Sequence, residues 1–158
     1  MNHAVEADII RISTDGSCIG NPGPGAWAFV AVDEKSGDTL EVQSERFNNT
    51  TNQQMELSAV LAALEAFQDA DRPLVIESDS QYVIKGITQW IQSWKNNNWR
   101  TAARKPVSNA HLWRELDGLV EGRDLSWQWV KGHAGNQSNE RADALAYSKA
   151  RSLESSHG

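Results

Sequence analysis

The sequence predicts an α/β protein built on one mixed β-sheet, and three observations support this fold class. The 158 residues and their 39% hydrophobic content suit a single domain with one core. The first part of the chain holds three runs of β-forming residues separated by turns, which is typical of an antiparallel meander. Helix and strand patterns then alternate, which favours strands connected by helices that cover the sheet.

The meander is predicted from β-branched runs and from the turn residues between them. The first run stops at Asp15-Gly16, a pair typical of turns, and a loop rich in glycine and proline follows. The expected elements are a strand over residues 8–14, a loop over 20–25, a strand over 26–32, a turn over 34–38 and a strand over 39–47.

The second part is predicted from a change of period. Leu57, Val60, Leu61, Leu64 and Phe67 form a helical stripe, and the polar residues before it can cap a helix. The expected elements are a helix over residues 53–70, a strand over 73–78, helical turns over 80–86 and 87–95, a loop over 96–106, a helix over 108–120, a strand over 125–129, a loop over 131–135 and a helix over 139–151.

Composition excludes several classes of protein. The longest apolar stretch, residues 59–64, is too short to cross a membrane, and the N-terminal residues lack the apolar segment of a secretory signal. The single cysteine, Cys18, cannot staple the fold. We therefore expect one domain over residues 1–158, with a core at about 5–150 and a frayed tail at about 152–158. We expect it to be a cytoplasmic monomer without a membrane partner.

Charge is distributed unevenly along the chain. The net charge of −6 by itself disfavours a nucleic-acid partner. Residues 80–114, however, contain six Lys or Arg, no Asp or Glu, and four of the seven tryptophans. Such a mixture is typical of a surface that follows a phosphate backbone, although a solvated charged face and core tryptophans are the alternatives. Because Trp90 and Trp94 are four residues apart, we expect at least one of them to be partly buried.

Four acidic residues are candidates for a catalytic site. Asp15 and Asp79 each follow a predicted strand; Glu56 falls in the first turn of the predicted helix, and Asp143 falls early in the last helix. Each alone has a plainer interpretation, as a turn residue, a helix cap, a charge that offsets the helix dipole or a solvated surface acid. Functional groups in α/β sheets gather beyond the strand ends, so the two aspartates together favour a site.

If the four carboxylates converge, they repel one another and need cations to neutralise them. Oxygen ligands suit Mg2+ or Mn2+, and such ions keep waters and take substrate phosphates as further ligands. A pair of these ions is a known solution for phosphodiester cleavage. His133, in a loop flanked by glycines, could move protons near such a site, although a lone loop histidine is more often simply exposed.

The motifs in order closely resemble those of the bacterial type 1 ribonuclease H family, over roughly residues 5–150. They are Thr14-Asp-Gly-Ser-Cys-Ile-Gly-Asn-Pro-Gly-Pro-Gly25, Thr51-Asn-Gln-Gln-Met-Glu-Leu57, Ser78-Asp-Ser-Gln-Tyr-Val83, Trp129-Val-Lys-Gly-His-Ala-Gly135 and Asn139-Glu-Arg-Ala-Asp143. The resemblance implies a five-stranded mixed sheet flanked by about five helices. It also implies endonucleolytic hydrolysis of the RNA strand of an RNA–DNA hybrid, with 5′-phosphate and 3′-hydroxyl ends.

The resemblance also implies roles for individual residues. Asp15 would bridge two Mg2+ ions, with Glu56 and Asp79 completing one metal site and Asp143 the other; His133 would assist proton transfer or product release. Hybrid-binding residues would be Asn21, Asn52 and Gln81 near the scissile phosphate, and Trp90, Trp94, Lys95, Arg100 and Lys105 in a basic protrusion that holds the DNA strand.

The chain departs from the family pattern at several positions. Gln54 stands where relatives often carry Arg, and Asn136 stands where a second loop histidine is common. The protrusion reads Lys95-Asn-Asn-Asn-Trp-Arg100, with fewer cations than in many relatives. We therefore expect weaker hybrid binding with unimpaired chemistry.

Three other functions compete with this interpretation. An integrase- or transposase-type nuclease uses fewer acids in different spacing and normally carries further DNA-binding domains. A non-catalytic module that binds RNA–DNA hybrids gains nothing from clustered acids facing phosphates. A small-molecule metal hydrolase leaves the basic tryptophan-rich segment unexplained.

Overall fold

Three antiparallel strands form one half of the sheet in the computed structural model, which describes residues 8–132 and 136–152. They are β1 (Ile10–Cys18), β2 (Gly23–Asp33) and β3 (Thr39–Thr50). The register runs from Ile10 opposite Asp33 to Cys18 opposite Gly25 between β1 and β2. The predicted meander is confirmed.

Two parallel strands complete the sheet on the other side of β1. They are β4 (Leu74–Ser78) and β5 (Leu125–Trp129), and the strand order is β3-β2-β1-β4-β5. β4 pairs in parallel with both β1 and β5. Leu74 and Ile76 of the short β4 are buried in the apolar core, as expected of a strand covered by helices. The predicted five-stranded mixed sheet is therefore confirmed.

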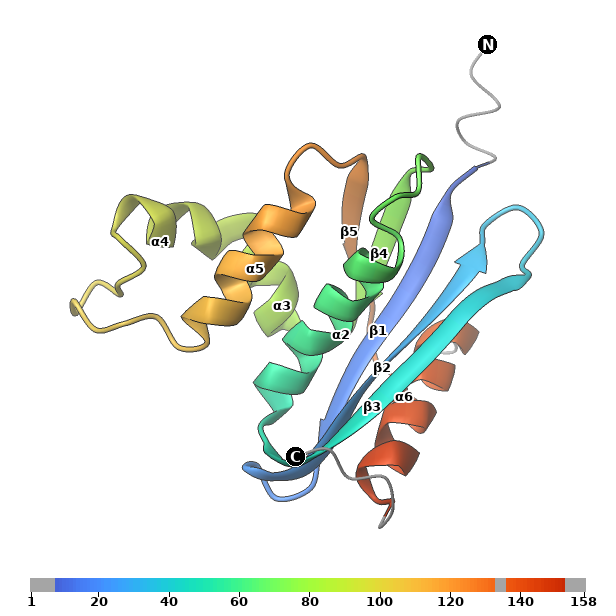
Figure 1. The fold of residues 1–158 in the computed structure, drawn as a ribbon, viewed down its shortest axis with the longest axis horizontal. Helices are drawn as coiled ribbons and strands as arrows, with labels where there is room; N and C mark the ends of the chain where they lie inside the picture. Colours follow the sequence, from blue (N-terminus) through green and yellow to red (C-terminus); the bar gives the residue numbers. More distant parts are fainter. Residues whose placement is uncertain (1–7, 133–135, 153–158) are drawn as a thin grey trace.

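Helices cover both faces of this sheet (Figure 1). On one face α2 (Asn52–Ala66) packs on β1 and β2, and α5 (Ala110–Val120) packs on α2. On the other face α6 (Gln137–Ala150) packs on β1, β2 and β3. The large apolar core lies between the sheet and the helices α2 and α5, around Ile12, Phe29 and Trp113.

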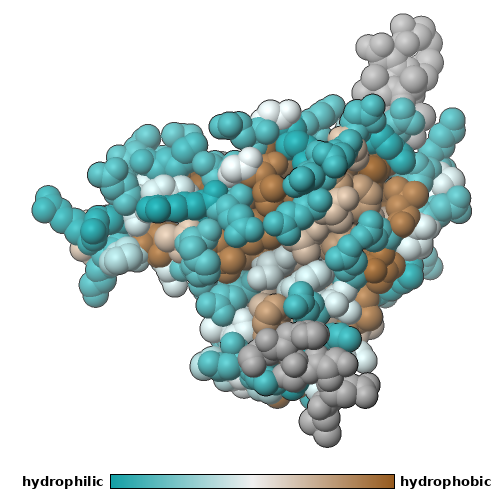
Figure 2. Space-filling view, in the orientation of Figure 1, coloured by the Kyte–Doolittle hydropathy of each residue, from teal (hydrophilic) through white to brown (hydrophobic). Residues whose placement is uncertain are grey.

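A continuous helical stretch leads away from the sheet. It consists of α3 (Gln81–Lys85), the π-helical turn η1 (Gly86–Trp90) and α4 (Ile91–Asn96), and a loop returns from it to α5. In Figure 1 this protrusion extends to the left, and in Figure 2 the same end of the molecule is largely hydrophilic. Because these turns join, the described residues form four helical stretches where about five helices were expected.

Several predicted boundaries were wrong, each for a physical reason. β1 continues through Asp15-Gly16 to Cys18, because β2 supplies backbone partners along its whole length. α2 begins at Asn52, since the Thr51 hydroxyl accepts a hydrogen bond from the backbone N–H of Gln54 and caps the helix, and it ends at Ala66. The remaining helices begin or end within two residues of expectation. Residues 153–158 of the predicted tail lie outside the described residues.

Five aromatic rings hold the protrusion to the body. Tyr82, Trp90, Trp94, Trp99 and Trp113 form a chain of edge-on and tilted contacts with centroids 5.3–6.4 Å apart. Trp113 is fully buried, Trp94 is half-buried and Trp90 is exposed. The expected partial burial of one of Trp90 and Trp94 is confirmed. The aromatic content of this segment thus serves packing as well as surface.

Across residues 8–132 and 136–152, the structure contains no helix with both the length and the apolar character needed to cross a membrane.

Candidate active site

Asp15 and Asp79 are neighbours at one edge of the sheet. The parallel register of β1 and β4 ends with Thr14 opposite Ser78, so the two aspartates are the next residues on adjacent strands. Adjacent strands lie about 4.8 Å apart and residues in register face the same side, so both carboxyls share one face. Asp79 lies after the strand as expected. Asp15 does not, because β1 continues beyond it.

A close approach between β1 and α2 brings Glu56 to the same edge. A Cβ atom on Gly16 would lie 2.4 Å from the backbone nitrogen of Glu56 and 2.8 Å from the Cβ of Met55, so only glycine fits there. The Glu56 carboxylate accepts a hydrogen bond of 2.8 Å from the Ser80 hydroxyl, directly after Asp79. Because α2 starts at Asn52, Glu56 lies in the second turn, and the predicted first-turn position was wrong.

Asp143 reaches the site from α6, on the face of the sheet opposite to α2 and Glu56. It follows the buried Ala142 near the middle of α6, where an early helical position was expected. Its hydrogen bonding and charge both raise the pKa of Asp15, so the two carboxyls lie together. The four acids therefore come from four elements, β1, α2, the β4 end and α6, and the structure brings all of them to one place.

The electrostatics of this cluster are unfavourable without a cation. Burial, followed by the charge of Asp79, the hydrogen bonding and charge of Asp143 and the charge of Glu56, raises the pKa of Asp15 to about 9. Burial and the charge of Asp79 also raise the pKa of Glu56, against the lowering effect of the Ser80 hydrogen bond. The buried Oδ2 of Asp15 has no hydrogen-bond partner among the described residues.

These groups fit divalent cations. A cation would compensate the buried carboxylate of Asp15, and an all-oxygen donor set suits Mg2+ or Mn2+. Within residues 8–132 and 136–152, no three Asp, Glu, His or Cys side chains stand ready to hold one ion together. Mg2+ completes its shell with waters and substrate phosphates, so the carboxylates need not enclose an ion by themselves.

Two backbone contacts fix the position of Asp79. The indole nitrogen of Trp129 donates a hydrogen bond of 3.1 Å to the Asp79 carbonyl. A Cβ on Gly132 would lie 2.9 Å from Oδ2 of Asp79, so the chain after β5 passes directly against this carboxylate. His133 comes next in the sequence, and it lies outside the described residues.

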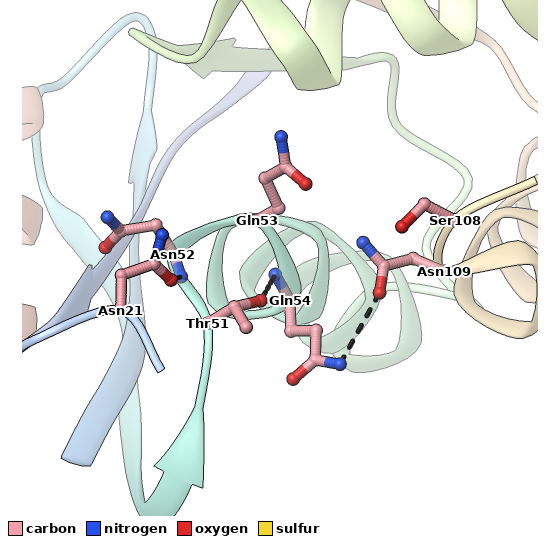
Figure 3. Close-up of a pocket in the computed structure, with 7 residues that line it drawn as sticks. All are labelled: Asn21, Thr51, Asn52, Gln53, Gln54, Ser108 and Asn109. Carbon is pink, nitrogen blue, oxygen red and sulfur yellow. Dashed lines mark hydrogen bonds between the residues drawn. The ribbon is translucent and has the colours of Figure 1, made fainter. Parts of the chain in front are cut away.

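A polar pocket of about 530 Å³ contains two of the predicted hybrid-binding residues, Asn21 and Asn52 (Figure 3). The Asn21 side-chain oxygen accepts a hydrogen bond of 2.9 Å from the backbone N–H of Asn52, which links the β1–β2 loop to α2. The other residues that line this pocket are Thr51, Gln53, Gln54, Ser108 and Asn109. The sequence did not indicate Ser108 and Asn109, because only tertiary packing places the start of α5 beside α2.

The other predicted hybrid-binding residues lie along the helical stretch after β4 and in the loop that follows it. Gln81 lines a separate pocket of about 310 Å³ with Trp129, whose side chain is 45% exposed. Further out, Lys95 forms an ion pair of 3.2 Å with Asp117, while Arg100 and Lys105 are exposed. The sequence could not show the pairing of Lys95, which offsets one positive charge of the protrusion.

Comparison with known proteins agrees with this geometry. The RNase H family model matches residues 8–151. The chain belongs to the RNase H family. It is 48% identical over 143 residues to a ribonuclease H of Bradyrhizobium diazoefficiens, covering 89% of each chain, and 52% identical over 135 residues to one of Alkalilimnicola ehrlichii, covering 84% of this chain and 88% of the relative.

Solved RNase H structures have the same fold. LC9-RNase H1 has a TM-score of 0.80 at 30% identity, covering 91% of this chain and 72% of that one. LC11-RNase H1, solved in complex with an RNA/DNA hybrid, has a TM-score of 0.68 at 25% identity, covering 88% of this chain and 94% of that one. The predicted family is confirmed. So is the enzyme class: ribonuclease H, the endonucleolytic hydrolysis of the RNA strand of RNA–DNA hybrids.

Proposed function

We propose that Asp15, Glu56, Asp79 and Asp143 hydrolyse the RNA strand of RNA–DNA hybrids with two Mg2+ ions, leaving 5′-phosphate and 3′-hydroxyl ends. The observation that carries this proposal is the state of Asp15. Its carboxyl is buried, its Oδ2 has no partner among the described residues, and three other acids help to raise its pKa to about 9. Such a group is costly to a fold without cations and useful where cations bind.

In this proposal Asp15 would help to hold both ions, Glu56 and Asp79 would complete one site, and Asp143 would complete the other. Bound cations supply activation of the attacking water and stabilisation of the leaving oxygen, and Mn2+ could substitute for Mg2+. The chain's own part is to hold the carboxylates in place. Ser80 orients Glu56 by its hydrogen bond, and Trp129 and Gly132 fix Asp79.

His133 is proposed to transfer protons or assist product release, because in the sequence it directly follows Gly132, which lies against Asp79. Its neutral form can accept a proton near pH 7, which suits that role. A His133→Ala variant should lower kcat while leaving hybrid affinity in the absence of metal unchanged.

The hybrid is proposed to lie across the polar pocket of Figure 3, the carboxylates and the protrusion. Asn21, Asn52 and Gln81 offer amide groups that can hydrogen-bond to 2′-hydroxyls or phosphates near the cut. Trp90, Trp94, Lys95, Arg100 and Lys105 are proposed to contact the DNA strand, since aromatic and basic groups together suit sugars and phosphates. LC11-RNase H1, which shares this fold, was solved in complex with an RNA/DNA hybrid, and this supports hybrid binding as such.

The cytoplasmic location, the monomeric state and the single catalytic domain remain predictions of the sequence. The alternative, a module that binds hybrids without cutting them, has no observation in its favour. Clustered acids at the centre of a phosphate-binding surface add no attraction for phosphate, so such a module would gain nothing from them.

The test is cleavage of an end-labelled RNA–DNA hybrid with Mg2+ or with chelator. We expect metal-dependent cutting of the RNA strand alone, with 5′-phosphate products, and loss of at least about 1,000-fold in kcat in Asp79→Asn. Glu65→Gln is the matched control for Glu56→Gln, since Glu65 is an exposed acid on the same helix. An active Asp79→Asn enzyme would refute the site, and a folded wild type that binds hybrid but never cuts it would favour the binding module.

A further inference from the structure

Glu77 is a buried acid that the proposed chemistry does not use. It lies in β4, two residues before Asp79, and its side chain is only 3% exposed. Alternate residues of a strand share a face, so Glu77 is on the same face as Asp79, the face that carries α6. A carboxylate buried this deeply needs several hydrogen bonds to offset its desolvation.

Its hydrogen bonds come from two other elements that carry catalytic acids. The Ser13 hydroxyl donates to Oε1 at 3.0 Å and the Arg11 guanidinium donates to Oε2 at 2.8 Å, both from β1. The side-chain nitrogen of Asn136 donates to Oε1 at 3.2 Å, from the start of α6. Glu77 therefore joins β1, β4 and α6, the elements that position Asp15, Asp79 and Asp143.

Asn136 has a second function at the same point. Its side-chain oxygen accepts a hydrogen bond of 2.8 Å from the backbone N–H of Asn139 and so caps α6. The side-chain amide of Asn136 thus accepts a hydrogen bond from the α6 backbone through its oxygen and donates one to Glu77 through its nitrogen. The N-terminus of α6 is fastened to β4, whereas the body of the helix packs mainly on β1, β2 and β3.

The rest of α6 packs on the sheet through small side chains. Its fully buried apolar side chains are Ala142, Ala146 and Ala150. At the far end, the buried Arg46 donates a hydrogen bond of 3.3 Å to the carbonyl of Ala150. Asp143 lies seven residues from each of these two fastenings.

We propose that Glu77 and Asn136 are positioning residues that set where Asp143 meets Asp15 and Asp79, an inference that rests on the function proposed above. An α-helix is stiff, so a shift of its N-terminus moves the carboxylate two turns away. Displacement of a catalytic group by about 1 Å can cost up to about 100-fold in rate. Loss of the Glu77–Asn136 hydrogen bond should therefore lower kcat without weakening hybrid binding.

The test is a reversal of the hydrogen bond. Asn136→Asp keeps the oxygen that caps α6 but turns the group that faces Glu77 into a second carboxylate. Glu77→Gln in the same chain supplies an amide that can donate to the new carboxylate at position 136 and restores the net charge. Gln137→Glu is the matched control, because it adds the same charge at the next position, which is exposed.

Three measurements separate positioning from a loss of folding. We expect Asn136→Asp to lower kcat about 10- to 100-fold, to leave KM for the hybrid within about twofold, and to weaken Mg2+ binding measured by calorimetry without substrate. Amide hydrogen exchange of residues 139–143 should accelerate. The double variant should recover most of kcat and of Mg2+ affinity, and Gln137→Glu should match the wild type.

Each outcome decides one proposal. An Asn136→Asp enzyme with wild-type kcat and Mg2+ affinity would overturn the positioning role, as would a double variant no better than Asn136→Asp alone. A loss of kcat in Gln137→Glu equal to that of Asn136→Asp would assign the effect to charge and overturn it as well. A wild type that binds hybrid but does not cut it would instead refute the proposed function itself.

Discussion

Asp15 is a residue that lowers the stability of the folded protein when no cation is bound. Its side chain is 5% exposed, and its neighbours are acidic. In the unfolded chain its carboxyl is solvated and ionises at the ordinary pKa of 3.8, whereas in the folded chain its pKa is about 9. The folded protein therefore loses stability through this group as the pH rises from about 4 to about 9, when no cation is bound.

Asp15→Asn should remove this loss. In chelator at pH 8 we expect the variant to melt above the wild type, by about 2–4 °C for each kcal/mol gained. The difference should shrink toward pH 4, where both side chains are uncharged in the fold, and it should also shrink in Mg2+, since bound ions stabilise the wild type. Thermal unfolding followed by circular dichroism at both pH values measures it, with Glu65→Gln as the control that changes little. An equal difference at pH 4 and pH 8 would argue against the electrostatic cause.

Gln54, which stands where relatives often carry Arg, lines the polar pocket. Its side-chain oxygen accepts a hydrogen bond of 2.9 Å from the Thr50 hydroxyl, and its nitrogen lies 3.4 Å from the Asn109 oxygen across the polar pocket. An arginine here would present a fixed positive charge to the pocket. The uncharged amide joins β3, α2 and α5 without adding attraction for phosphate, which agrees with the weaker hybrid binding that we expect.

At the level of elements, the protrusion depends on a tight contact with α5. A Cβ on Gly86 would lie 2.0 Å from the Trp113 ring, which is fully buried and whose indole nitrogen donates to the Tyr82 hydroxyl at 3.1 Å. The ring cannot move aside without breaking that hydrogen bond. The glycine is therefore needed for its lack of a side chain, because its backbone is helical with φ −59°.

Gly86→Ala should destabilise the protein by about 1–3 kcal/mol through overpacking. Gly118→Ala is the matched control, since Gly118 lies in α5 with no atom within 4 Å of the position that its new methyl group would take, and a helical glycine exchanged for alanine gains about 0.5–1 kcal/mol. Urea unfolding at equilibrium measures both. Equal stability of the two variants would mean that the helix at residue 86 shifts freely from Trp113.

The sequence predicted elements well where the signal is local. The apolar stripe from Leu57 to Phe67 predicted α2, and the alternation around Trp127 predicted β5. Both signals come from the spacing of apolar residues that are near one another in the sequence. The strand end at Asp15 was wrong, because Asp-Gly favours a turn locally while β2 supplies partners as far as Cys18 opposite Gly25. Long-range pairing of this kind leaves no mark in a local pattern.

At the candidate site, too, local signals could be recognised in the sequence and long-range contacts could not. Four acids in family motifs could be named from the sequence, and the structure brings them together. The hydrogen bonds of Glu77 could not be named, since alternation in β4 gives only the face and not the partners from β1 and α6. The ion pair of Lys95 with Asp117 was equally invisible, because it joins α4 to α5 across the fold.

The whole molecule separates its charges between a basic protrusion and an acidic remainder. Residues 80–114 carry six positive side chains and no acid, so the rest of the chain holds all 21 acidic residues and repels a nucleic acid at long range. Within the protrusion, Asn96 and Asn97 line a cavity of about 370 Å³ beside Arg100 and Arg104. Two neutral residues thus occupy positions from which a cation could reach a phosphate.

Asn96→Lys with Asn97→Lys should tighten hybrid binding through phosphate contacts alone. We expect higher affinity at low salt and a plot of log affinity against log salt concentration that is steeper by about 0.9 for each phosphate gained. kcat should not change, because α4, which ends at Asn96, lies away from the sheet edge that carries the carboxylates (Figure 1). Ala66→Lys with Gln68→Lys adds the same charge at exposed positions near the end of α2 and should leave the slope nearly unaltered. Unchanged binding of the first variant at low salt would mean that the DNA strand does not pass over Asn96 and Asn97.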